Sequence, residues 1–564
     1  MPDSIRLQQA ARLEPAAQTA VSVLVTFLRR QSGGQVERAQ TLAHPYMLVV
    51  GDTPAKVPAE LAKVEHDGYV MQPAGGGMTL AAHNAKGLLN AVYGYLAWHG
   101  VLWPAPGEEV LPLKGALRFP EKTIVRTPAF SRRGIFYSGP TDSWENWCAF
   151  YARLGFNEIS LHVSDDAAAS WKALLKLSER YGIKLQLGGH GLAKLLPRDL
   201  FKEHPDYFRE LQPPDFDRTR MPDSNICSGN PEALAIVRAG AEQYARRFPK
   251  ATAYHLWADD LPAGGWCCCS RCMGYPPQDQ AILGNNAVAE GVAKVNPTAK
   301  TAHLIYHDTI EPPRMAKPHP ALAPLYAPRE RCYAHALDDP TCARNRDYRE
   351  KLEQVLDYFG RPEWLLFEYY SDYILFRAML PLIPEVVAAD LKYYRAQGLD
   401  CAMHLQVGTI VGLQLNMHVF AQQAWDLDAD PWEPLRKLAA GVPGLLDAWT
   451  LQAQASYRWL DISDWPLDRC LDYRFLLERP AAEADAYSTA CRQAAEELDA
   501  ALAKLPAKLP FWAKREKLSL ATSAGICRQM ETQMTMLGAL GQCAGGEYRW
   551  PEAKAAYRET LKRG

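Results

Sequence analysis

Residues 231–257 read PEALAIVRAGAEQYARRFPKATAYHLW, a segment with a helical pattern that leads into a short run typical of a buried strand. Residues 231–247 form the predicted helix, and residues 253–257 form the predicted strand. A helix followed by a buried strand is one step of the repeating unit that builds parallel sheets. This stretch therefore favours an α/β fold for the central part of the chain.

The same order of strand and helix recurs from about residue 131 to residue 430. Eight strand candidates alternate with helices: residues 134–137, 158–163, 183–187, 253–257, 301–306, 331–334, 364–369 and 402–406. Their number, and a region length of roughly 300 residues, predict a closed (β/α)8 TIM-like barrel. An open, doubly wound sheet is the alternative, but no Gly-x-Gly-x-x-Gly follows a predicted strand and no phosphate-binding loop is present.

The regions on either side of the barrel have a different character. Residues 68–71 and 78–82 flank the turn Gly75-Gly76-Gly77 and predict a hairpin within a small sheet. After residue 430, long helical patterns replace the alternation. We therefore predict three domains, which are a small α/β domain at 1–125, a catalytic barrel at 126–430 and a helical domain at 431–564.

Composition excludes some classes of partner. The net charge is −2 over 564 residues, so no basic field is available to attract nucleic acid or an anionic membrane. No apolar run is long enough to span a bilayer, and the first residues lack the apolar stretch of a signal peptide. The sequence predicts a soluble protein, cytoplasmic as written, or periplasmic or secreted if a signal peptide has been removed.

Polar and aromatic side chains follow nearly every predicted barrel strand. Barrel enzymes place their sites at these strand ends, so we expect the side chains to converge on one site. The candidate substrate-binding residues are Tyr137, His162, His190, Trp257, Tyr306, His307, Tyr333, His335, Tyr369, Tyr370 and His404. The candidate catalytic acids are Asp259, Asp260 and Glu368, because two carboxylates with separated pKa values can act as a proton donor and as a negative charge near a reacting carbon.

The segment Cys267-Cys268-Cys269-Ser270-Arg271-Cys272 is the most unusual local feature. Thiolates spaced as C-x-C-x-x-C can bind one tetrahedral Zn²⁺ in a closed, structural site. The predicted metal ligands are Cys227, Cys267, Cys269 and Cys272. Two alternatives stay open, namely free or partly disulfide-bonded cysteines and a cysteine nucleophile that acts with His190. No cofactor is expected for catalysis.

Several short motifs occur in a fixed order between residues 40 and 430. They include Gly188-Gly189-His190, Trp257-Ala258-Asp259-Asp260 and Phe367-Glu368-Tyr369-Tyr370. Together they resemble glycoside hydrolase family 163, a bacterial group first described as a domain of unknown function, with a (β/α) barrel behind a hexosaminidase- or glucuronidase-like α/β domain. The resemblance implies a retaining endo-β-N-acetylglucosaminidase that acts on N-glycans.

Members of such families use the 2-acetamido oxygen of the substrate as the nucleophile. They differ in this from most glycoside hydrolases, in which one carboxylate acts as the acid and a second acts as the nucleophile or base. Carried onto this chain, the resemblance implies that one acid among Asp259, Asp260 and Glu368 donates the proton and another polarises the acetamide. Hexosaminidases have an Asp-Glu pair for these roles, whereas this chain has two aspartates in succession, Asp259 and Asp260. The expected partner is an oligosaccharide or the glycan of a glycoprotein.

Two other functions are compatible with the same sequence. An α-glucuronidase needs a cation for the uronic acid, and Arg132, Arg133 and Arg331 are candidates. A non-catalytic carbohydrate-binding protein would keep the aromatic residues without converging acids.

Overall fold

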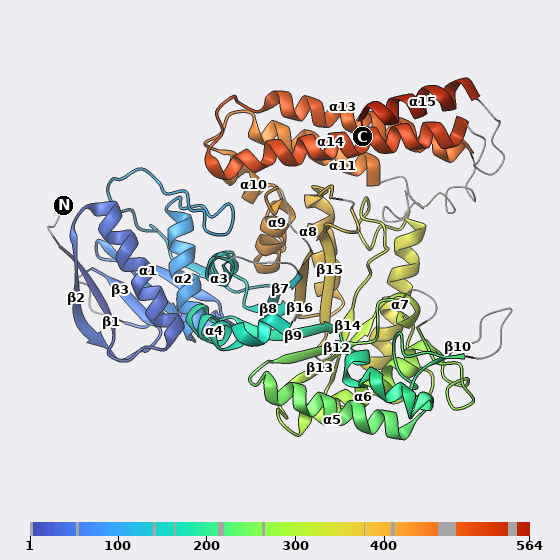
Figure 1. The fold of residues 1–564 in the computed structure, drawn as a ribbon. Helices are drawn as coiled ribbons and strands as arrows, with labels where there is room; N and C mark the ends of the chain where they lie inside the picture. Colours follow the sequence, from blue (N-terminus) through green and yellow to red (C-terminus); the bar gives the residue numbers. More distant parts are fainter. Residues whose placement is uncertain are drawn as a thin grey trace.

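The computed structural model describes residues 4–51, 56–138, 143–162, 165–211, 219–261, 265–361, 363–376, 378–407, 412–460, 481–539 and 550–563. An N-terminal sheet, a central barrel and a group of C-terminal helices follow one another along the chain (Figure 1).

The N-terminal part is a six-stranded sheet of order β2-β1-β3-β5-β4-β6. Its strands are β1 (Ser4–Ala10), β2 (Gln35–Leu42), β3 (Met47–Val50), β4 (Tyr69–Ala74), β5 (Gly77–Ala82) and β6 (Ile124–Arg126). The predicted hairpin is confirmed, because β4 and β5 pair antiparallel. Helix α2 (Ala85–Trp98) packs on this hairpin and against α1 (Pro15–Ser32). The Asn84 side chain begins α2 by accepting the backbone N–H of Gly87 at 2.8 Å.

The central part is a closed barrel in which neighbouring strands are parallel. Around the barrel the order is β12-β13-β14-β15-β16-β7-β8-β9, and β9 pairs with β12 to close it. The strands are β7 (Arg132–Ser138), β8 (Glu158–Leu161), β9 (Lys184–His190), β12 (Ala253–Trp257), β13 (Lys300–Ile305), β14 (Leu322–Tyr326), β15 (Leu365–Asp372) and β16 (Cys401–Val407). The predicted (β/α)8 barrel is confirmed, and the open-sheet alternative is wrong.

Helices surround the barrel strands. They are α3 (Trp144–Arg153), α4 (Asp165–Tyr181), α5 (Pro231–Arg247), α6 (Pro277–Ala293), α7 (Ala343–Phe359), α8 (Pro384–Ala396) and α9 (Leu415–Trp425), and a two-stranded ribbon of β10 (Glu210–Leu211) and β11 (Thr219–Arg220) precedes α5. Helix α5 has the bounds that the sequence predicts, because Asn230 caps its first turn and Pro231 occupies the first helical position.

One predicted barrel strand is wrong. Residues 331–334 form no strand, and the sixth barrel strand is β14, nine residues earlier at Leu322–Tyr326. Pro324 lies in the middle of β14 and cannot donate a hydrogen bond to a neighbouring strand. Proline in a run argues against a central strand, and this is why the sequence pattern conceals β14.

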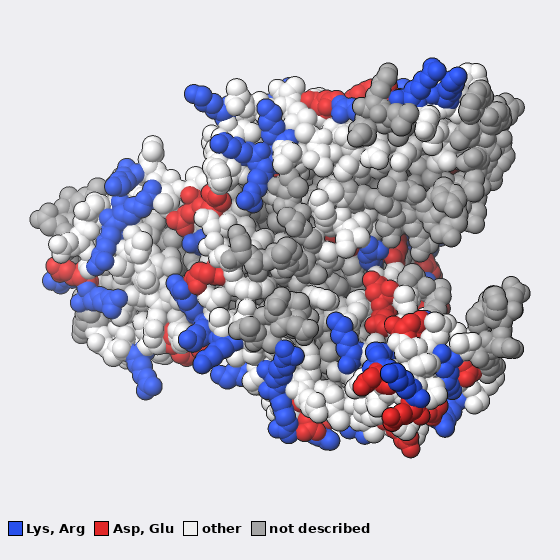
Figure 2. Space-filling view, viewed as in Figure 1, with Lys and Arg blue, Asp and Glu red and all other residues white. Residues whose placement is uncertain are grey.

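The C-terminal helices lie above the barrel in Figure 1. They are α10 (Glu433–Ala439), α11 (Leu445–Leu460), α13 (Ala481–Lys504), α14 (Lys514–Ala539) and α15 (Trp550–Arg563). Helix α13 packs against both α11 and α14. Among the helices that the structure describes, none combines the length and apolar character needed to cross a bilayer. On the face in Figure 2, basic and acidic side chains are intermixed.

Candidate active site

A cavity of about 400 Å³ opens at the carboxyl ends of the barrel strands. Each strand, or the loop directly after it, contributes to the wall. The described lining includes five aromatic residues, namely Phe136, Trp257, Tyr306, Phe367 and Tyr369. It also includes three histidines, His162, His190 and His307. Its four charged side chains are Asp260, Arg329, Glu330 and Asp372. Active sites of barrel enzymes occupy this end, so the cavity is the candidate active site. We call it the barrel-mouth cavity.

His307 lies between two carboxylates of the cavity. Its Nδ1 is 2.9 Å from Oε2 of Glu330, and its Nε2 is 3.9 Å from Oδ1 of Asp260. The first contact is a close ion-pair contact, whereas the second lies at the outer limit of one. The imidazole therefore lies against Glu330 through Nδ1, and Nε2 is the ring nitrogen nearer to Asp260.

The backbone of His307 is in the left-handed region, with φ of 48°. A non-glycine residue rarely adopts this conformation unless its surroundings impose it. Thr309 imposes it here, because its hydroxyl donates to the carbonyl of Tyr306 at 2.8 Å and accepts the Tyr306 N–H at 3.2 Å. The Trp266 indole holds the same turn by donating to Asp308 at 2.7 Å. The turn therefore fixes the imidazole in the cavity wall.

Arg329 neutralises the acidic side of the cavity. Its Nε is 3.1 Å from Oδ2 of Asp372, and its Nη1 is 3.3 Å from Oε1 of Glu330. Burial alone would raise the pKa of Glu330, but the contact with His307 and its charge, together with Arg329, hold it below its usual value. Glu330 is therefore a carboxylate at neutral pH.

Aromatic rings also line the cavity. The rings of Phe136 and Trp257 stack with centroids 5.4 Å apart, and those of Phe136 and Phe367 are 4.7 Å apart. Burial and the charge of Asp260 raise the pKa of Tyr306, so its phenol stays protonated. A cavity lined by both flat apolar rings and carboxylates suits a sugar, which has apolar ring faces and polar edges.

His190 is oriented by the backbone. Its Nδ1 lies 2.6 Å from the carbonyl oxygen of Ala258, which can only accept, so Nε2 is the acceptor of the neutral ring. The two glycines before His190 allow close packing of the strands. A Cβ on Gly188, whose φ is +125°, would lie 1.8 Å from the carbonyl of His255, and one on Gly189 would lie 2.3 Å from the His162 ring. The two glycines therefore let β9 pack against β12 and β8.

The predicted acids separate in the structure. Asp260 faces the cavity, and its side chain is 55 % exposed. Asp259 does not line the cavity, because its Oδ2 accepts the backbone N–H of Asn225 at 2.9 Å. Glu368 does not line it either, since strand alternation directs Phe367 and Tyr369 inward and Glu368 outward against α8.

Glu368 belongs to a buried ion-pair network between β15 and α8. Its Oε1 is 3.3 Å from Nε of Arg331, and both side chains are fully buried. Tyr394 donates to Glu368, and Arg331 also contacts Asp390. Burial raises the pKa of Glu368 against the opposing charge of Arg331. This geometry indicates a structural role in place of the predicted catalytic one.

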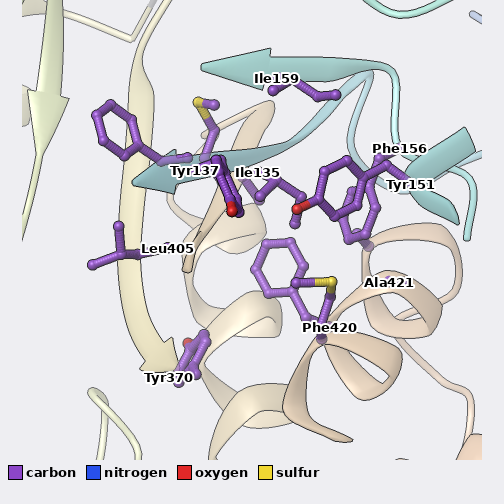
Figure 3. Close-up of a cluster of buried hydrophobic side chains, with 14 of the residues drawn as sticks. Ile135, Tyr137, Tyr151, Phe156, Ile159, Tyr370, Leu405, Phe420 and Ala421 are labelled. Atoms are coloured by element: carbon purple, nitrogen blue, oxygen red, sulfur yellow. The ribbon is translucent and has the colours of Figure 1, made fainter. Parts of the chain in front are cut away.

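The predicted substrate-binding residues also divide into two groups. Six of them line the cavity, which are His162, His190, Trp257, Tyr306, His307 and Tyr369. The others do not, and these are Tyr137, Tyr333, His335, Tyr370 and His404. Tyr137 and Tyr370 lie in a buried cluster with Tyr151 and Phe420 (Figure 3). They point outward because strand alternation directs the residue before each of them into the cavity.

The arginines considered for uronic acid binding lie elsewhere. Arg132 pairs with Glu158 at 2.8 Å, and Arg133 pairs with Asp67 at 2.6 Å, both at the amino end of β7. Arg331 is fully buried in the network of Glu368. Among the described residues that line the cavity, Arg329 is the one arginine or lysine, and it already contacts two carboxylates.

A second cavity, of about 560 Å³, lies between the N-terminal sheet and helices α9 and α10. It is larger, but it is remote from the strand ends, and its charges are paired. Arg126 is 3.3 Å from Asp426, and Lys437 is 2.6 Å from Glu433. The barrel-mouth cavity therefore remains the better candidate for chemistry.

The structure brings the four predicted metal ligands together. Cys227, Cys267, Cys269 and Cys272 are buried, and their sulfur atoms all lie within 4.8 Å of one another. None of the described cysteines lines the barrel-mouth cavity, so the geometry does not support a cysteine nucleophile acting with His190.

Arg329, Glu330 and Asp372 are site residues that the sequence analysis does not identify. Glu330 follows β14, the strand that the sequence pattern conceals, and Asp372 ends β15 three residues beyond the predicted end. The paired charges at 329–330 are the available signal, once β14 is placed correctly.

A family model described as a domain of unknown function, DUF4838, matches residues 103–434, which is more than half of the chain. The chain belongs to the DUF4838 family. The match covers the whole barrel, including the cavity and the cysteine group. No curated protein matches this DUF4838 member.

Solved structures of glycoside hydrolases are similar to this DUF4838 chain in fold. A GH138 enzyme that targets pectin rhamnogalacturonan II aligns with a TM-score of 0.59 at 10 % identity, over 99 % of this chain and 91 % of that one. A family 89 glycoside hydrolase from Clostridium perfringens, in complex with PUGNAc, aligns with a TM-score of 0.52 at 11 % identity, over 97 % of this chain and 65 % of that one.

Proposed function

We propose that this protein is a glycoside hydrolase whose active site is the barrel-mouth cavity. The observation that carries the proposal is the placement of Asp260 and Glu330 on the two sides of His307, both facing one cavity walled by aromatic rings. The fold shared with GH138 and family 89 glycoside hydrolases supports the same reaction class.

The proposed substrate is a β-linked N-acetylglucosaminide within an N-glycan, cleaved in the endo mode with retention. The resemblance to glycoside hydrolase family 163 supports this choice of sugar. The paired state of Arg329 supports a neutral sugar over a uronic acid, since a uronate needs a cation that is available to it.

The two acids have different proposed roles. Asp260 donates a proton to the glycosidic oxygen as the bond from C1 to that oxygen breaks and the alcohol leaves. The acetamide oxygen of the substrate attacks C1, and Glu330, held as a carboxylate, accepts the acetamide N–H and stabilises the positive ring that forms. Water then attacks C1 as the bond from C1 to the acetamide oxygen breaks, and Asp260 takes a proton from that water, which restores the acid and the acetamide and gives the retained product.

The test is chromophore release from aryl glycosides, including a β-N-acetylglucosaminide and an α-glucuronide, together with glycan release from an N-glycoprotein. Wild type is compared with Asp260→Asn and with Glu311→Gln, a matched change of an exposed acid outside the cavity. We expect the N-acetylglucosaminide or the glycan to be cleaved, and Asp260→Asn to lose about 10²–10⁴-fold in rate. Cleavage of the glucuronide alone would move the proposal to that sugar. Full activity in Asp260→Asn would refute the assignment of the acid.

A further inference from the structure

A group of four thiols joins two loops beside the candidate active site. Cys227 lies in the segment between β11 and α5, and Cys267, Cys269 and Cys272 lie between β12 and α6. None of the four is more than 3 % exposed, and they form a separate cluster that contains no other buried apolar residue. We call these residues the cysteine quartet.

The sulfur positions fit a tetrahedral metal site. The Sγ atom of Cys227 is 3.6 Å from those of both Cys269 and Cys272. A zinc–sulfur bond of ~2.3 Å gives a tetrahedron with edges of roughly 3.8 Å. A disulfide needs ~2.05 Å between the sulfur atoms, so these pairs are not bonded to each other.

Backbone donors are directed at the sulfur atoms. The N–H of Glu210 donates to Cys267 at 3.3 Å, and the N–H of Gly229 donates to Cys272 at 3.1 Å. Hydrogen bonds of this kind stabilise metal-bound thiolates and orient them. A small apolar cluster would have no need of them, so the surroundings favour thiolate ligands over packed thiols.

We propose that the cysteine quartet binds one structural Zn²⁺ that clamps the loop before α5 to the loop after β12. Four protein thiolates complete the tetrahedron and leave no position for water or substrate. The ion therefore has a structural role and takes no part in the cleavage reaction.

The clamp lies next to the proposed acid. Cys227 is two residues from Asn225, whose N–H donates to Asp259 at 2.9 Å and whose Oδ1 accepts the Asp259 N–H at 2.8 Å. The Asn225 side chain also donates to the carbonyl of Gly265 at 2.6 Å, just before the C-x-C-x-x-C segment. Asp259 precedes Asp260, so the metal would position the proton donor. This positioning role rests on the proposed function, whereas metal binding does not.

The experiment measures metal in the full-length protein, purified without chelator from zinc-supplemented medium. We expect mass spectrometry of the metal content to give about one zinc per chain in wild type, and almost none in Cys269→Ser/Cys272→Ser. Cys148→Ser is the control, because it removes a buried thiol that belongs to neither group of side chains that could hold a metal ion. Full zinc content in the quartet variant, or none in wild type, would overturn the proposal.

A second measurement does not depend on whether the variants fold. Wild type loaded with Co²⁺ should show the charge-transfer and visible bands of a tetrahedral tetrathiolate site, and Zn²⁺ should abolish them by displacement. A cobalt spectrum typical of oxygen ligands would contradict the quartet as the site. These metal measurements use no substrate, so they stand or fall separately from the glycosidase assay. If zinc is confirmed, its loss should also lower the rate of the enzyme.

Discussion

Glu330 holds His307 through a contact of 2.9 Å between its Oε2 and the imidazole Nδ1, on the side of the ring away from Asp260. The contact does two things at once. It orients the imidazole in the cavity wall, and it keeps Glu330 as a carboxylate beside the cavity. A pair arranged in this way suits a reaction in which positive charge develops on a sugar ring.

We therefore expect Glu330→Gln to reduce kcat/KM by about 10²-fold or more, because the amide cannot supply the negative charge. The protein should remain folded, since Arg329 keeps Asp372 as a partner. Steady-state kinetics on the substrate identified in the glycoside panel, with circular dichroism as the check on folding, measure the effect. Activity equal to that of Glu311→Gln would remove Glu330 from the catalytic machinery.

Glu368→Gln should lower stability and leave catalysis nearly intact. After the change, Asp390 is the one carboxylate partner left to the buried guanidinium of Arg331 in the described network. Disrupting a buried ion pair lowers the free energy of unfolding by about 3 kcal/mol. Urea unfolding measures the loss of stability, and kcat measured below the unfolding transition gives the activity.

The two interpretations of Glu368 differ by orders of magnitude in that rate. A catalytic carboxylate would cost about 10²–10⁴-fold, whereas a structural one should change kcat by a few-fold at most. A large fall in kcat with unchanged stability would return Glu368 to the active site and contradict its placement against α8.

The sequence predicts the barrel well because its signal is repetitive. Seven of the eight predicted strands overlap barrel strands of the structure, and α5 has the predicted bounds. Each buried parallel strand is a short apolar run next to an amphipathic helix, and both patterns are local. The cysteine quartet could be predicted for a similar reason, because three of its members lie within six residues.

The active-site acids are harder to predict, because the sequence must give both the position of a residue on its strand and the side of the strand to which its side chain points. In β15, Phe367 and Tyr369 face the cavity and Glu368 faces α8, so one residue of register separates a wall residue from a structural one. Glu330 depends on the position of β14, which Pro324 conceals. Sequence periodicity gives the repeat of a strand, but packing decides which of its faces is inside.

Asp67→Ala should destabilise the contact between the N-terminal sheet and the barrel by about 3–5 kcal/mol. Asp67 accepts from Arg133 at 2.6 Å, and the change leaves that buried guanidinium without its carboxylate. Urea unfolding measures the cost. Asp426→Ala is the matched control, because it breaks an exposed pair with Arg126 and should cost about 0–1 kcal/mol. Equal effects of the two changes would contradict a special role for Asp67.

The helical region carries an independent pH-dependent group, Glu516 on α14. Its Oε1 accepts the N–H of Leu413 at 2.6 Å, and its Oε2 accepts the indole N–H of Trp449 at 2.9 Å. The carboxyl is buried, and burial raises its pKa to about 7, against the two hydrogen bonds that lower it. The buried carboxyl therefore favours the folded protein most when it is protonated.

A raised pKa fixes the sign of the effect on stability. The contribution of Glu516 is complete below the unfolded pKa of about 4.3 and is lost as the pH rises through the folded value of about 7. Relative to Glu516→Gln, the free energy of unfolding of wild type should fall by on the order of 3 kcal/mol between pH 5 and pH 8. Urea unfolding at several pH values measures this difference. The control is Glu496→Gln, a change of an exposed acid on α13, for which the difference in free energy of unfolding from wild type should not vary with pH. If the difference between wild type and Glu516→Gln also did not vary with pH, Glu516 would have to be ionised in the folded protein from pH 5 to pH 8. Only a proton held by the buried carboxyl makes the free energy of unfolding fall with pH in this range.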